Sequence, residues 1–126
     1  MRRRKGLSSL EHEFYKRHAD LCKVFSHPTR LEILNILQEE EMSVSKLAKR
    51  LGVAIGNLSQ HLNMMKQRGV VISRKEANNV YYRLGNLKML EAFGLIREIL
   101  REQMQRESVL IRHLERAQTR SQRAAS

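Results

Sequence analysis

Several residue types that would mark other classes of protein are scarce in this chain. It has one cysteine, Cys22, so no intrachain disulfide can form, and this cysteine usage fits a reducing cytoplasm. It has no run of 18 apolar residues, and its basic start is followed by a polar segment, so we expect neither a transmembrane nor a secreted protein. A nucleophile elbow, a phosphate-binding loop and a Cys and His pair at a telling spacing are also missing, which argues against an enzyme and a cofactor.

Positive charge is abundant, and it is unevenly distributed. The formal charge of the 126 residues is +11. Residues 43–84 carry eight Lys and Arg against one Glu, whereas residues 11–41 carry four bases against seven acids. A protein that places one face against nucleic-acid phosphates has this distribution. A membrane surface would also attract such charge, but no segment combines it with a lipid-inserting apolar face.

The basic segment contains the pattern of a helix-turn-helix. Leu47 and Leu51 are four residues apart, and so are Leu58 and Leu62, which predicts one apolar stripe on each of two short helices. Gly52 lies between the helices, where a left-handed residue ends a helix best.

Two strands are predicted after Gly69, which ends the second helix in the same way. Val70–Ile72 and Val80–Tyr82 are rich in β-branched and aromatic residues. The polar residues between them include Asn78 and Asn79, which tolerate positive φ, so the strands should form a hairpin. A helix-turn-helix followed by a hairpin is a winged helix, although on periodicity alone any small α+β domain could show these elements.

Two helices are expected before this segment. The first covers residues 9–25, with Ser9 as its N-cap, and the second begins at Pro28 and is central in the core. Met42 could start a short strand that pairs with the wing. The predicted fold is therefore mainly α with a small β-hairpin wing, in the order helix, helix, short strand, helix, helix, strand, strand, helix.

The longest helical pattern runs from 87 to 118, with Asn86 as its N-cap. Its apolar stripe is longer than a core of this size can cover, so we expect it to pair with its own copy in a homodimer, together with residues 9–25. The domain would cover 9–118, between basic flexible tails at 1–8 and 119–126. The residues predicted to form the dimer interface are Leu10, Phe14, Leu21, Phe93, Ile96, Leu100 and Met104.

The second helix of the helix-turn-helix is the predicted DNA reader. Asn and Gln side chains make paired hydrogen bonds to adenine, Ser reaches a base or a phosphate, and Lys and Arg suit phosphates. His61, beside the inward stripe, is expected to be half-buried rather than a reader. The predicted DNA-binding residues are Lys46, Gly56, Asn57, Ser59, Gln60, Asn63, Lys66, Arg74, Lys75 and Asn79.

Four pieces in order resemble the ArsR/SmtB family of winged-helix repressors: Leu21–Leu34, Gly52–Leu62, Gly69–Val71 and Val80–Leu84. The resemblance covers roughly residues 20–104. It implies a dimer, a recognition helix in the major groove of a pseudo-palindromic operator, and release on sensing a metal or another signal. Two departures concern the DNA-facing part: Gly56 stands where many members have Pro or Ser, and Ala77-Asn78 where the wing often has Gly-Arg.

The ligand positions of the family's metal sensors are not matched. Ser43-Val44-Ser45 stands where arsenic sensors carry Cys-x-Cys, and hydroxyls are poor ligands for soft ions. Of the zinc-sensor positions, which fall here on Asn86, Lys88, Ile99 and Glu102, only Glu102 could bind a metal. We therefore expect no metal site. The remaining histidines are expected at the surface, although His12 and His113 could approach in a dimer.

Two alternatives to a repressor that does not respond to metals remain open. Cys22 is expected to be a buried, inert thiol, but a reactive thiol would make the protein a thiol-responsive regulator. A winged helix can also serve as a protein-interaction module that does not read DNA, a reading that the departures at Gly56 and the wing tip favour.

Overall fold

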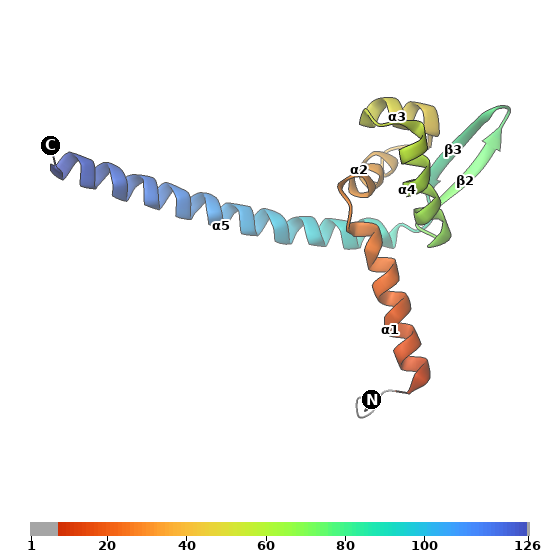
Figure 1. The fold of residues 1–126 in the computed structure, drawn as a ribbon, viewed down its shortest axis with the longest axis horizontal. Helices are drawn as coiled ribbons and strands as arrows, with labels where there is room; N and C mark the ends of the chain where they lie inside the picture. Colours follow the sequence, from red (N-terminus) through yellow and green to blue (C-terminus); the bar gives the residue numbers. More distant parts are fainter. Residues whose placement is uncertain (1–7, 126) are drawn as a thin grey trace. The chain divides into compact units, whose positions relative to one another are not determined.

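The computed structural model describes residues 8–125, without the side chains at 121, 122 and 125. The described residues fall into two compact units, divided between Leu90 and Glu91 (Figure 1). The predicted tail at 1–8 lies outside the described residues except for Ser8. The predicted order of elements is confirmed: it is that of a winged helix-turn-helix.

Helix α1 (Ser9–Cys22) continues into a short 3₁₀ helix, η1 (Lys23–Phe25). Its N-cap is Ser8 and not the predicted Ser9, because the Ser8 hydroxyl accepts a hydrogen bond from the Glu11 amide at 3.1 Å. Helix α1 has no buried residue. Its apolar positions are thus left uncovered within one chain.

Helix α2 (Pro28–Leu37) forms the centre of the core. Pro28 occupies the first turn, where its missing N–H costs nothing. The side chain of His27 caps the helix, since its Nδ1 accepts a hydrogen bond from the Thr29 amide at 3.1 Å. The predicted central position of this helix agrees with its buried residues, which are Ile33, Leu34, Ile36 and Leu37.

Helices α3 (Val44–Leu51) and α4 (Ile55–Gln67) form the helix-turn-helix. The Ser43 hydroxyl caps α3 by accepting from the Lys46 amide at 3.2 Å. Gly52 and Gly69 have φ values of 67° and 74°, which confirms that left-handed residues end both helices.

The strands form one antiparallel sheet in the order β1 (Met42–Ser43), β3 (Asn79–Leu84), β2 (Val71–Glu76). The expected pairing of Met42 with the wing is confirmed, opposite Tyr82. Glu76 pairs with Asn79, so Ala77 and Asn78 form a two-residue loop. The positive φ falls on Ala77, at 54°, and not on Asn78 or Asn79 as predicted, because the register places Asn79 in the strand.

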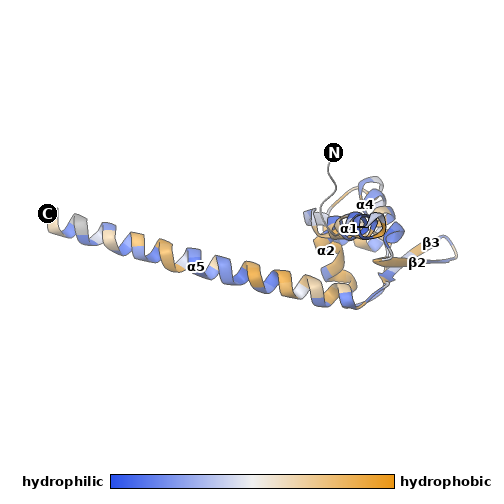
Figure 2. Ribbon diagram, turned by 90° about the horizontal axis from the view of Figure 1, so that it is seen from below, coloured by the Kyte–Doolittle hydropathy of each residue, from blue (hydrophilic) through white to orange (hydrophobic). Residues whose placement is uncertain are grey.

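Helix α5 (Lys88–Ala125) is one continuous helix of 38 residues. The Asn86 side chain accepts a hydrogen bond from the Lys88 amide at 2.9 Å, in its predicted capping role. The helix includes residues 119–125, for which the sequence predicts a flexible tail; Arg, Gln and Ala there are good helix formers. Figure 2 shows apolar and polar positions alternating along α5.

Candidate nucleic-acid interface

Helix α4 is oriented by its apolar stripe. Leu58, Leu62 and Met65 are fully buried, as predicted. The opposite side of the helix therefore faces solvent, and of the residues predicted to contact DNA only Ser59 is half-buried there. The exposed predicted residues of α4 are Gly56, Asn57, Gln60, Asn63 and Lys66.

Arg68, at the end of α4, joins this helix to α1. Its Nε donates to the Asp20 carbonyl at 3.1 Å, its Nη2 to the Asp20 carboxylate at 2.8 Å, and its Nη1 to the Met64 carbonyl at 3.3 Å. The hydrogen bond from Arg68 lowers the pKa of the Asp20 carboxyl. Because the guanidinium donates to three acceptors, it holds the C-terminal end of α4 in one position. This contact joins residues 48 positions apart, and it was not predicted from the sequence.

His61 contacts His27 rather than pointing toward solvent. The two imidazole centroids are 4.4 Å apart, and His61 is half-buried as expected. Burial lowers the pKa of His61, and the charges of His27 and Arg30 lower it further. Since His27 caps α2 through Nδ1, this pair connects the cap of α2 to the recognition helix.

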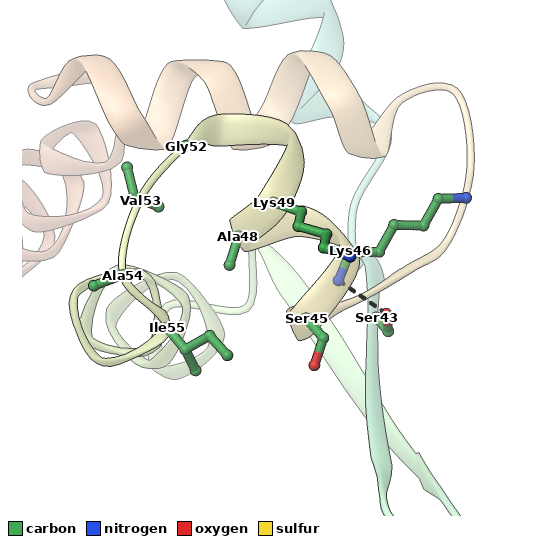
Figure 3. A pocket seen from close by; sticks show the side chains of 9 residues that line it. All are labelled: Ser43, Ser45, Lys46, Ala48, Lys49, Gly52, Val53, Ala54 and Ile55. Atoms are coloured by element: carbon green, nitrogen blue, oxygen red, sulfur yellow. Dashed lines mark hydrogen bonds between the residues drawn. The ribbon is translucent and has the colours of Figure 1, made fainter.

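An open groove of about 770 Å³ lies between α3 and the start of α4 (Figure 3). Apolar side chains of Ala48, Val53 and Ile55 line it, and Lys46 and Lys49 supply positive charge. Lys49 was not among the predicted residues, although its position three residues after Lys46 places both on one helix face. Lys46 Nζ lies 3.8 Å from Glu40 Oε1. Both side chains are more than half exposed, so this ion pair is weak.

The wing presents fewer free cations than its sequence suggests. Arg74 donates to Glu41 from Nε and Nη2 at 2.9 and 2.6 Å and to Glu76 from Nη1 at 2.6 Å. Its guanidinium also lies 4.5 Å from the Tyr81 ring centroid, and its pKa is raised by the hydrogen bonds to Glu41 and then Glu76. These two carboxylates already bind the Arg74 guanidinium, which does not favour the phosphate contact predicted for Arg74. Lys75 and Asn79 are exposed.

Six of the seven residues predicted for the dimer interface are exposed within one chain. They are Leu10, Phe14, Leu21, Ile96, Leu100 and Met104. Phe93 differs, since only 7% of it is exposed, and its ring lies under the Arg97 guanidinium at 5.1 Å. Phe93 is therefore buried by its own chain. The sequence pattern alone does not tell such a residue from one that packs in the dimer.

Two of the positions that correspond to metal ligands in the family's sensors, Ser43 and Asn86, cap helices α3 and α5. Within residues 8–125, no group of three or more His, Cys, Asp or Glu side chains could hold a metal ion. Cys22 is exposed rather than buried as predicted, because α1 buries none of its residues in this chain.

The class follows from these elements: a helix-turn-helix with a hairpin wing, whose second helix presents amides and one lysine, is a winged-helix nucleic-acid-binding domain. Residues 27–73 match the model of the bacterial regulatory proteins of the ArsR family. An uncharacterized HTH-type transcriptional regulator of Mycobacterium tuberculosis, Rv0081, is 33% identical over 87 residues, which are 68% of this chain and 76% of that protein. The chain therefore belongs to the ArsR family of DNA-binding transcriptional regulators, and the expectation that it is not an enzyme is confirmed.

Solved structures agree with this assignment. Rv0081 superposes with a TM-score of 0.67 at 32% identity, over 72% of this chain and 92% of that one. The transcriptional repressor BigR from Xylella fastidiosa gives 0.61 at 30% identity, over 74% and 96%. The homodimeric winged helix-turn-helix domain of Mb0332 from Mycobacterium bovis gives 0.70 at 26% identity, over 80% and 94%. Among the helices of residues 8–125, none could span a lipid bilayer.

Proposed function

We propose that this protein is a homodimeric repressor that binds a pseudo-palindromic operator, with one α4 in the major groove of each half-site. The exposed face of α4 carries this proposal, because it presents three amides in succession, Asn57, Gln60 and Asn63, with Lys66 at its end. Amide side chains pair with adenine, and lysines contact phosphates. Its place of action would be the cytoplasm, where bacterial DNA lies.

The dimer determines the form of the operator. Mb0332 is a homodimer with the same winged helix, and BigR is named a repressor. Two recognition helices related by two-fold symmetry require two half-sites, roughly one helical turn or 10–11 base pairs apart. The exposed apolar residues of α1 and α5 are the surface through which the two copies would join.

We further propose that arsenite, cadmium and zinc do not release the protein from DNA through the family's two usual sites. Soft-ion binding needs several thiolates or imidazoles at about 2.0–2.3 Å. Ser43 and Asn86 offer oxygens that already accept helix-capping hydrogen bonds. Operator binding should persist with equimolar metal. Release that disappears on mutation of His12 or His113 would instead place a site between the ends of the chain.

Selection of DNA from a random pool, followed by salt titration of the selected and random duplexes, tests the proposed function. We expect enrichment of a two-fold symmetric site and a steep loss of affinity with salt, since phosphate contacts release counterions. A flat salt dependence with no enriched site would favour the protein-interaction module.

A thiol-responsive regulator remains the second candidate, because Cys22 is exposed in one chain. A Cys22→Ser variant should bind the operator as the unaltered protein does under reducing conditions. If peroxide releases only the unaltered protein from DNA, Cys22 senses oxidation.

A further inference from the structure

Ile55 stands apart from the other exposed apolar residues. Large hydrophobic side chains exposed within residues 8–125 lie on α1, on α5 or just before α5 at Leu87, and Ile55 is the single exception. It is 52% exposed, and it is the first residue of α4. The dimer that would cover α1 and α5 therefore does not account for Ile55.

The surroundings of Ile55 are those of a DNA-facing surface. Its side chain lines the open groove in which Lys46 and Lys49 supply the charge (Figure 3). Figure 3 shows the Ile55 side chain pointing from the start of α4 toward Ser45 in the first turn of α3. Because Ile55 is 52% exposed in the first turn of α4, its side chain is accessible to a ligand that approaches this end of the helix.

Duplex DNA presents one apolar group to a side chain at this place. The N-terminal residues of a recognition helix contact base edges in the major groove, and there the thymine C5-methyl group is the apolar feature. The amide side chains of α4 cannot use this methyl group, whereas the branched Ile side chain can remove it from water. A protein partner fits less well, since Ile55 is the one large apolar side chain exposed in this groove and Lys46 and Lys49 lie beside it, so the surface is not a large hydrophobic patch.

We propose that Ile55 is a specificity-determining residue that reads a thymine methyl group in each half-site. This inference rests on the proposed function, because it requires that α4 lies in the major groove. It adds a thymine to the adenines that the amides of α4 would select. The operator would therefore contain a fixed thymine at the edge contacted by the start of α4.

Uracil substitution tests the contact, because deoxyuridine lacks only the C5-methyl group of thymidine. Each thymine of the selected operator is replaced in turn, and affinity is measured for the unaltered protein and for Ile55→Ala. We expect one thymine in each half-site whose replacement weakens the unaltered protein about fourfold, the effect of burying one methyl-sized group. Ile55→Ala should bind the thymine operator about as weakly, and it should lose nothing further at that position.

Gln60→Ala is the matched control at another exposed position of α4. It should bind the operator more weakly but keep the full uracil effect at the Ile55 thymine. Ile55→Ala should keep its unfolding temperature, because Ile55 is not part of the core. Operator preference without any uracil effect that depends on Ile55 would overturn this inference alone. If no operator is preferred over random DNA, both the inference and the proposed function fail.

Discussion

Helices α4 and α5 carry apolar stripes with the same steps of three and four residues, yet only the stripe of α4 is buried within one chain. Leu58, Leu62 and Met65 are fully buried, whereas Ile96 and Leu100 are about half exposed. The difference shows that one sequence pattern serves two kinds of partner. The stripe of α4 packs the recognition helix against its own domain. The stripe of α5 is exposed, and we interpret it as the surface that binds a second copy of the chain.

The largest effect is expected where the α4 stripe is broken. Leu62→Ala should lower the free energy of unfolding by about 2–5 kcal/mol, because a cavity replaces a fully buried side chain. Urea unfolding followed by circular dichroism measures this change. Gln67→Ala, at an exposed position of the same helix, should cost no more than about 0.5 kcal/mol. Equal costs for the two variants would mean that the stripe does not hold α4.

Breaking the α5 stripe should change association rather than folding. Ile96→Glu with Leu100→Glu should convert dimers to monomers at micromolar concentration, because two charges would be placed in an apolar seam. Light scattering measures the mass, and operator affinity should fall because one chain reads one half-site. Phe93 is left unchanged, since it is buried within one chain. Gln105→Glu adds charge at an exposed polar position and should remain dimeric, and a monomeric unaltered protein would contradict this account.

The contact between Arg68 and Asp20 sharpens the comparison, because it joins α4 to the exposed helix α1. Arg68→Ala should lower the unfolding temperature more than Asp20→Asn does. The first change removes every hydrogen bond of the guanidinium, whereas the second leaves the two carbonyl acceptors in place. Differential scanning calorimetry compares the variants. An unchanged unfolding temperature in Arg68→Ala would show that the core alone positions α4.

The smallest expected effect is a pH dependence at His61. Its pKa in the folded protein lies below the usual 6.5, so the unfolded chain binds a proton more readily. Stability should therefore fall as the pH decreases from about 6.5 through the lower, folded value, and it should be unaffected by this group above pH 7. His61→Asn should flatten that part of the stability curve in urea titrations. Identical curves for both proteins between pH 7 and 5.5 would remove His61 as the cause.

Local patterns made much of the fold predictable. The stripe of α4 and the left-handed glycines Gly52 and Gly69 follow from the spacing of a few neighbouring residues. The N-cap was predicted one residue too late, at Ser9 instead of Ser8, because composition does not show which of two adjacent serines caps the helix. The positive φ was predicted at Asn78 or Asn79 instead of Ala77, because composition does not show the register of the hairpin.

The candidate site was less predictable, because it depends on contacts between distant residues. Arg68 meets Asp20 across 48 positions, and Arg74 meets Glu41 across 33. A count of charges treats these arginines as free, while the structure pairs both. The exposure of Ile55 could be known only once α4 had been placed against the core.

The reading of bases by α4 is tested most directly by comparing Gln60→Ala and Lys66→Ala on the selected operator and on random DNA at one salt concentration. Gln60→Ala should lose about 1–3 kcal/mol of binding free energy on the operator and little on random DNA, because it removes a base contact. Lys66→Ala should weaken both by the same factor, because phosphates carry no sequence information. Equal losses for Gln60→Ala on the two DNAs would contradict base reading by the exposed face of α4.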